Sequence, residues 1–123
     1  MDRSLGKSIA NGLRAAGLVV HTMASVYCEE TAAGLPDEVW LRDAGHKDWV
    51  VLTADKAIRR RPAERDALNH AGVRVFCITS GQLRGRDQLA RFTDNLAAIL
   101  RRATEPGPWI YAVHAARIVR LYG

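Results

Sequence analysis

Three acidic side chains in the first half of the chain have the types and spacing of a metal site. Asp37 and Glu38 are adjacent, and Asp55 lies 18 residues after Asp37. Carboxylates with few softer donors beside them are the ligands that hard cations such as Mg²⁺ and Mn²⁺ prefer. An ion held in this way can activate a water molecule and stabilise charge on a leaving oxygen, which is the chemistry of phosphodiester hydrolysis.

One strand and the helix before it are expected to position these side chains. Residues 49–53 form a continuous apolar run typical of a strand buried on both faces, and Asp55 follows two residues later. Residues 36–45 read as a helix that opens with proline, Asp37 and Glu38, which favour the positive end of the helix dipole. Because this helix runs antiparallel to the strand, its N-terminus returns to the strand's carboxyl end, where ligands bind in such sheets.

Two competing interpretations stay open. Asp37 and Glu38 could serve only as partners of the helix dipole, with Asp55 capping the next helix. A phosphate-accepting domain of the receiver type also places aspartates after strands, but it wants a lysine after a late strand. Thr79 follows the predicted strand 73–78, with no lysine nearby.

The other elements continue the alternation of helix and strand. We expect helices over residues 4–16, 62–71 and 86–102, strands over 18–20 and 73–78, a long loop over 21–35, and a terminal hairpin of 109–113 and 118–122. Parallel strands need crossover connections, which helices supply. The 123 residues therefore predict a single α/β domain, residues 1–123, with a parallel sheet sandwiched by helices and a C-terminal β-hairpin.

Charge is distributed unevenly along the chain. Residues 1–58 contain six basic and eight acidic side chains, net −2, whereas residues 59–123 contain twelve and five, net +7. Only three of the 18 basic residues are lysines. Arginine's planar fork can bind a phosphate with two hydrogen bonds, so a polyanionic partner is one interpretation. A coding sequence rich in G and C, which favours arginine whatever the function, is the other.

Four of these cations follow the acidic position at the end of the central strand. Lys56, Arg59, Arg60 and Arg61 come directly after Asp55, so they could hold RNA phosphates beside the carboxylates. A solvated turn is the alternative, because a site for single-stranded RNA is also expected to offer stacking aromatic side chains.

Several classes of protein are disfavoured by what the sequence lacks. No apolar run approaches the roughly 20 residues of a membrane-spanning helix, and the N-terminus lacks the apolar core of a signal peptide, so we expect a cytoplasmic protein without membrane contacts. Cys28 and Cys77 have neither the spacing nor the flanking histidines of a zinc site, and a disulfide framework is not expected. No histidine spacing indicates nucleophilic catalysis.

Four segments, in this order and spacing, resemble a known family: Asp2-Arg3-Ser4-Leu5-Gly6, Pro36-Asp37-Glu38-Val39-Trp40-Leu41, Trp49-Val50-Val51-Leu52-Thr53-Ala54-Asp55-Lys56 and Ile58-Arg59-Arg60-Arg61-Pro62. The family is that of the PIN-like domains, specifically the VapC-like toxins of bacterial toxin–antitoxin pairs. The resemblance runs from Asp2 to about Tyr122.

The resemblance implies a metal-dependent endoribonuclease that acts on RNA and is paired with a cognate antitoxin protein. It also implies one or two Mg²⁺ or Mn²⁺ ions and a homodimer of the kind common among such toxins. Carried over residue by residue, the catalytic and metal-binding residues are Asp2, Asp37, Glu38 and Asp55, supported by the hydroxyls of Thr53 and Thr79.

The N-terminus departs from the family pattern. In the family the first aspartate ends a hydrophobic strand at the centre of the sheet, whereas here only Met1 precedes Asp2. We therefore expect a truncated first central strand, or a true start further upstream. The departure also keeps open an alternative function, a non-catalytic RNA- or protein-binding module on a decayed PIN scaffold.

Overall fold

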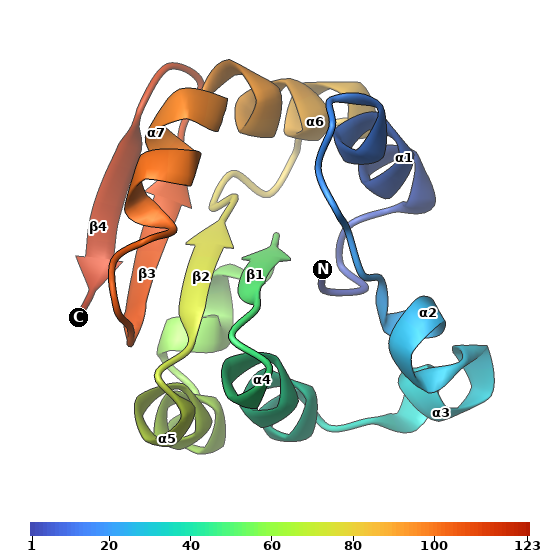
Figure 1. The fold of residues 1–123 in the computed structure, drawn as a ribbon, viewed down its shortest axis with the longest axis vertical. Coiled ribbons are helices and arrows are strands. Elements are labelled where there is room, and N and C mark those ends of the chain that lie inside the picture. The colour runs from blue at the N-terminus through green and yellow to red at the C-terminus, as the bar shows by residue number, and fades with distance from the viewer.

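A four-stranded sheet forms the middle layer of the protein (Figure 1). The computed structural model describes residues 1–123. The strands lie in the order β1 (Val50–Thr53), β2 (Arg74–Cys77), β3 (Trp109–Val113) and β4 (Ile118–Tyr122). The first three are parallel and β4 is antiparallel to β3, which confirms the predicted parallel sheet with a C-terminal hairpin.

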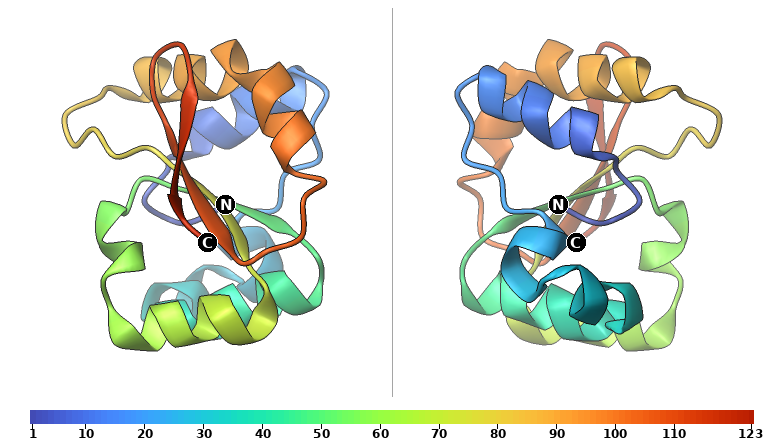
Figure 2. Two further views of the ribbon diagram at one scale, coloured as in Figure 1. Left: turned by 90° about the vertical axis from the view of Figure 1, so that its left-hand side faces the viewer. Right: turned by 90° about the vertical axis from the view of Figure 1, so that its right-hand side faces the viewer.

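Helices cover both faces of this sheet (Figure 2). They are α1 (Lys7–Ala15), α2 (Met23–Tyr27), α3 (Glu29–Gly34), α4 (Asp37–His46), α5 (Pro62–Ala71), α6 (Gly85–Asp94) and α7 (Leu96–Arg102), with a 3₁₀ turn, η1 (Lys56–Arg59). Successive side chains of β2 point to opposite faces. Val75 and Cys77 join the core beneath α4 and α5, whereas Phe76 packs with Trp109 beneath α1, α6 and α7.

The element boundaries that matter for the site follow from local chemistry. Pro62 is the first residue of α5. A backbone N–H at this position has no acceptor within the helix, so proline loses no hydrogen bond there. Gly72 ends α5 in the left-handed conformation, φ 63°, so the chain can turn directly into β2. Because β1 and β2 are parallel, the connections that leave their carboxyl ends emerge at one edge of the sheet.

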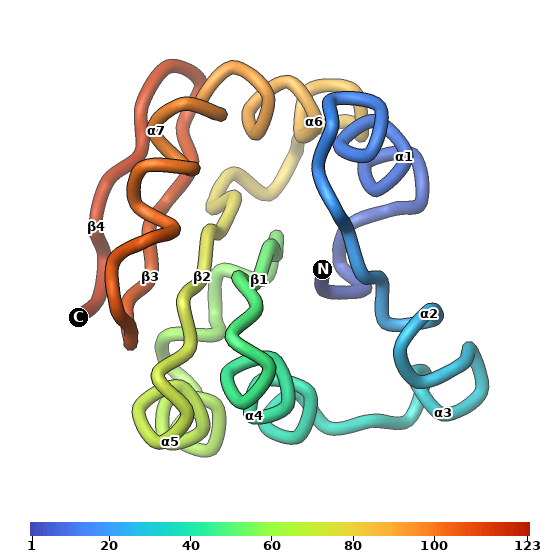
Figure 3. Tube along the Cα trace, in the orientation of Figure 1, coloured from blue at the N-terminus to red at the C-terminus, as the bar shows by residue number.

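The predicted strand at Leu18–Val20 is wrong. The segment is irregular, and the side chain of Val19 is 87% exposed. The N-terminus lies between this segment and β1 (Figure 3): the Met1 ammonium donates to the His21 carbonyl at 2.7 Å, and the Asp2 amide donates to the Leu52 carbonyl at 2.8 Å. No strand precedes β1, so β1 is an edge strand, and Leu18–Val20 does not pair with it.

Two other regions differ from the sequence-based expectation. The predicted loop 21–35 contains α2 and α3, because Thr22 and Ser25 cap α2 reciprocally, with side-chain to amide distances of 2.9 and 3.1 Å. The predicted helix 86–102 is broken at Asn95, whose buried amide donates to the carbonyls of Arg91 and His114 at 2.8 Å each. The Asn95 side chain thus connects the break between α6 and α7 to the β3–β4 turn.

None of the helices has the length and the apolar composition needed to span a membrane.

Candidate metal centre

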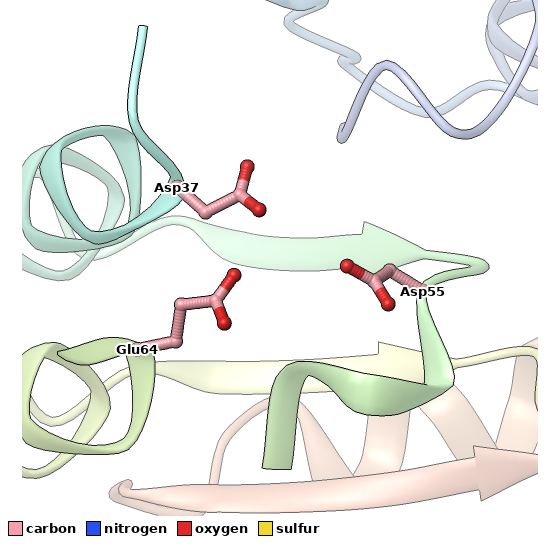
Figure 4. A group of neighbouring side chains, drawn as sticks. All are labelled: Asp37, Asp55 and Glu64. Carbon is pink, nitrogen blue, oxygen red and sulfur yellow. The ribbon is translucent and has the colours of Figure 1, made fainter. Parts of the chain in front are cut away.

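Three carboxylates from three different elements converge at the carboxyl edge of β1. One oxygen each from Asp37, Asp55 and Glu64 lies within 4.8 Å of the other two. Asp37 is the first residue of α4, Asp55 follows β1, and Glu64 is in the first turn of α5. Figure 4 shows all three carboxylates directed into the same space. The N-termini of α4 and α5, which carry partial positive charge, face this group.

Hydrogen-bond donors and positive charges around Asp37 favour its charged, carboxylate form. Its Oδ1 accepts from the Trp40 indole at 2.8 Å and from Arg3 Nη2 at 3.4 Å, and its Oδ2 lies 3.5 Å from Arg61 Nη1. Burial alone would raise the pKa of Asp37, but the neighbouring Glu64 carboxyl, the hydrogen bond from Trp40 and the two arginine charges outweigh it. The pKa therefore lies below its ordinary value.

Asp55 caps the 3₁₀ turn that follows β1. Its Oδ1 accepts from the Ala57 amide at 3.1 Å, which orients the carboxylate. Its own amide donates to the Thr53 hydroxyl at 3.0 Å, and its Oδ2 lies 2.7 Å from Arg61 Nη1. These contacts leave the carboxylate of Asp55 facing Glu64 and Asp37 across the cluster.

Glu64 is the buried member of the group, with a side chain 4% exposed. Its Oε1 accepts from Arg61 Nη1 at 3.0 Å, whereas its Oε2 is buried without a hydrogen-bond partner. Burial, followed by the closeness of the Asp37 carboxylate, raises the pKa of Glu64 to about 7, against the opposing effect of Arg61. A buried carboxylate oxygen without a partner, beside two further carboxylates, fits a hard divalent cation.

A second polar network fixes the turn that carries Asp55. Asp2 is buried, and its Oδ2 accepts from the Thr53 hydroxyl at 2.6 Å and the Ser4 hydroxyl at 2.9 Å. The Ser4 hydroxyl in turn accepts from the Ala54 amide at 2.9 Å. Asp2 is therefore joined to Asp55 through Thr53, but it is not one of the three carboxylates that converge.

The other residues predicted for the site lie around the cluster. Glu38 is half-buried on α4 and lies outside the group of three carboxylates. Lys56 and Arg60 are exposed, Arg59 is half-buried, and none of these three cations forms an ion pair. Thr79 is half-buried in the connection between β2 and α6. Arg61, also predicted to contact RNA, contacts all three carboxylates.

Glu64 is the site residue that sequence reasoning missed. The signal was present: Glu64 stands in the first turn of a predicted helix that opens with Pro62. Asp37 and Glu38 have the same placement after Pro36. The helix that leads into β2 must also begin near the carboxyl edge of the sheet, so the argument used for Asp37 applies equally to Glu64.

Comparison with known proteins identifies the family of the chain. A family model described as a PIN like domain matches residues 1–80, which include all three converging carboxylates. This chain belongs to the PIN-like domain family. A protein of Mycobacterium tuberculosis (strain ATCC 25618 / H37Rv) named "Putative ribonuclease VapC45" is 37% identical over 122 residues, which cover 98% of this chain and 88% of that protein. The resemblance of this PIN-like chain to the VapC-like proteins is thereby confirmed. No solved structure matches the chain.

Proposed function

We propose that this PIN-like domain is a Mg²⁺- or Mn²⁺-dependent endoribonuclease, the toxin component of a toxin–antitoxin pair. The observation that carries the proposal is the convergence of Asp37, Asp55 and Glu64 within 4.8 Å around a buried, unpartnered oxygen of Glu64. The ribonuclease name of the relative supports the same reaction class.

Asp37, Asp55 and Glu64 are the proposed ligands of the ion. A bound Mg²⁺ or Mn²⁺ supplies Lewis acidity and lowers the pKa of a water molecule. Asp37 is already charged at neutral pH, and Asp55 is oriented by the Ala57 amide, so these two ligands need little rearrangement. Glu64 must lose the proton that it holds below pH 7 before its carboxylate can bind an ion.

The remaining polar residues have positioning and substrate-binding roles in this proposal. Asp2 and Thr53 hold the turn that carries Asp55, through bonds of 2.6 and 3.0 Å. Asp2 and Glu38 are candidate ligands for a second ion, and Thr79 is a candidate donor to the substrate.

The cations after Asp55 are the proposed contacts for RNA. Lys56, Arg59 and Arg60 form no ion pair, so their charges are available to phosphates. These cations follow Asp55 closely along the chain, so an RNA strand bound to them would lie beside the ion. The cognate antitoxin is a protein partner, and a homodimer is the proposed assembly of this single domain.

The test is cleavage of RNA by the purified protein in Mn²⁺ or Mg²⁺, with EDTA as the blank. The Asp55→Asn variant should be inactive. Asp66→Asn is the matched control, because Asp66 is an exposed carboxylate of α5 that forms no ion pair, and it should cleave RNA like the unmodified protein.

Two results would contradict the proposal. Cleavage that persists in EDTA would show a reaction independent of the ion. RNA binding without cleavage under any divalent ion would favour the non-catalytic module on a PIN scaffold.

A further inference from the structure

We propose that Arg61 is a built-in competitor of the metal ion: its guanidinium closes the acidic cluster in the metal-free protein, leaves when an ion binds, and then contacts RNA phosphate at the mouth of the site. The inference deepens the proposed function and rests on it, because it assigns a second role to the same cluster. Arg61, a cation of the chain itself, would thereby control whether a metal ion occupies the site.

The guanidinium of Arg61 occupies the place among the three carboxylates where a metal ion would bind. Arg61 Nη1 lies 2.7 Å from Asp55 Oδ2, 3.0 Å from Glu64 Oε1 and 3.5 Å from Asp37 Oδ2. The three carboxylates approach within 4.8 Å of one another, and a Mg²⁺ ion bonds oxygens at about 2 Å. The nitrogen and an ion bound to the same oxygens would overlap, so one must leave before the other binds.

Arg61 is free to leave because only the acidic cluster holds its guanidinium. All its side-chain hydrogen bonds go to Asp37, Asp55 and Glu64, and the side chain is 49% exposed. Arg3 is a useful contrast. It also contacts Asp37, but it donates to the carbonyls of Ala32 and Leu35, and these backbone bonds tie it to α3.

The charge balance of the cluster favours the exchange. Arg61 brings one positive charge to three carboxylates and leaves Glu64 Oε2 without a partner. A divalent ion brings twice that charge to about 2 Å, where attraction to the oxygens is stronger. The released side chain stays attached at the residue that precedes α5, next to Arg60, where its planar fork can bind a phosphate with two hydrogen bonds.

Calorimetric titration of the metal-free protein with Mn²⁺ tests the competition. Arg61→Gln should bind Mn²⁺ of the order of tenfold more tightly than the unmodified protein, since the ion no longer displaces a partly exposed ion-pair partner. Arg61→Lys keeps the charge but loses the fork, so it should bind with intermediate affinity. Arg60→Gln removes a neighbouring charge that pairs with nothing, and it should change affinity by less than twofold. Circular dichroism melts check that each variant is folded.

A second measurement tests whether the released Arg61 side chain binds RNA. A 2′-O-methyl RNA oligomer is the probe, and a gel run after each measurement checks that the oligomer is intact. In Mn²⁺, Arg61→Gln should bind the oligomer several-fold more weakly than the unmodified protein. In EDTA the two should bind alike, because Arg61 is then engaged by the carboxylates. A loss of equal size in both conditions would contradict a release that depends on the ion.

The outcomes separate this inference from the proposed function. If neither the unmodified protein nor Arg61→Gln binds Mn²⁺, both proposals are wrong. If Asp55→Asn abolishes Mn²⁺ binding but Arg61→Gln binds no more tightly than the unmodified protein, the site stands and the competitor is refuted. Equal gains in Arg61→Gln and Arg60→Gln, with none in Arg61→Lys, would mean that net charge alone sets the affinity.

Discussion

Replacing Glu64 by glutamine removes the buried ionisable group of the cluster and keeps its shape. The pKa of Glu64 is about 7 in the folded protein, against an ordinary value of 4.5. Between these values the folded state holds the proton more tightly than the unfolded state does. The stability that Glu64 contributes is therefore fully present below about pH 4.5 and is lost as the pH rises to about 7.

The size of the effect follows from the two pKa values. At pH 8 the ionised, buried Glu64 costs at most about 3 kcal/mol, since one pKa unit corresponds to about 1.4 kcal/mol. Glutamine avoids this cost, and the favourable effect of the half-exposed Arg61 on the ionised carboxylate is already contained in the pKa of Glu64. The metal-free Glu64→Gln variant should therefore be more stable at pH 8 by up to about 3 kcal/mol, or roughly 10 °C in melting midpoint.

Urea denaturation in EDTA at pH 5 and pH 8 measures this difference. At pH 5 the difference should shrink to less than about 1 kcal/mol, because Glu64 is protonated in the folded state and only the unfolded state has begun to ionise. Glu105→Gln is the control: Glu105 pairs with Arg102 at 2.6 Å across the same i,i+3 spacing but is 36% exposed, so its replacement should bring no gain that depends on pH. Parallel pH profiles for Glu64→Gln and the unmodified protein would refute the assignment of a raised pKa.

Three further predictions concern the ion and RNA. The affinity for Mn²⁺ should fall about tenfold from pH 8 to pH 6, because binding must displace the Glu64 proton; calorimetry at the two values checks this, and a constant affinity would contradict it. Asp55→Asn should lose RNA cleavage yet keep or raise its melting midpoint in EDTA, because one of three repelling carboxylates is gone; a fall of many degrees would make Asp55 a structural cap. Changing Arg59 and Arg60 together to glutamine should flatten the slope of log RNA affinity against log salt by about 1.4, and an unchanged slope would place the RNA on another surface.

The sequence predicts the sheet well because burial on both faces leaves a clear pattern. Continuous apolar runs identify β1 and β2 to within a residue at each end, and β3 and β4 have the predicted bounds. The topological argument also brings Asp37 and Asp55 to one edge of the sheet, where the structure places them within 4.8 Å. The order of the helices and strands along the chain, and the rule that helices connect parallel strands, were enough to predict these positions.

What the sequence does not reveal depends on neighbours that are distant along the chain. Leu18–Val20 has the composition of a strand, but a strand needs a partner, and this segment pairs with no strand of the sheet. Asn95 breaks a helix that looks continuous, because its amide finds a carbonyl in the β3–β4 turn. Arg61 is indistinguishable from Arg60 in the sequence, and only the fold shows which of them turns toward the acids.

The most direct test of the metal centre is a crystal structure of the protein soaked in Mn²⁺, with anomalous scattering recorded at the manganese edge. We expect one peak at roughly 2 Å from a carboxylate oxygen of each of Asp37, Asp55 and Glu64, with the guanidinium of Arg61 moved out of the cluster. No peak at this position, or a peak elsewhere while Arg61 still bridges the three carboxylates, would contradict it.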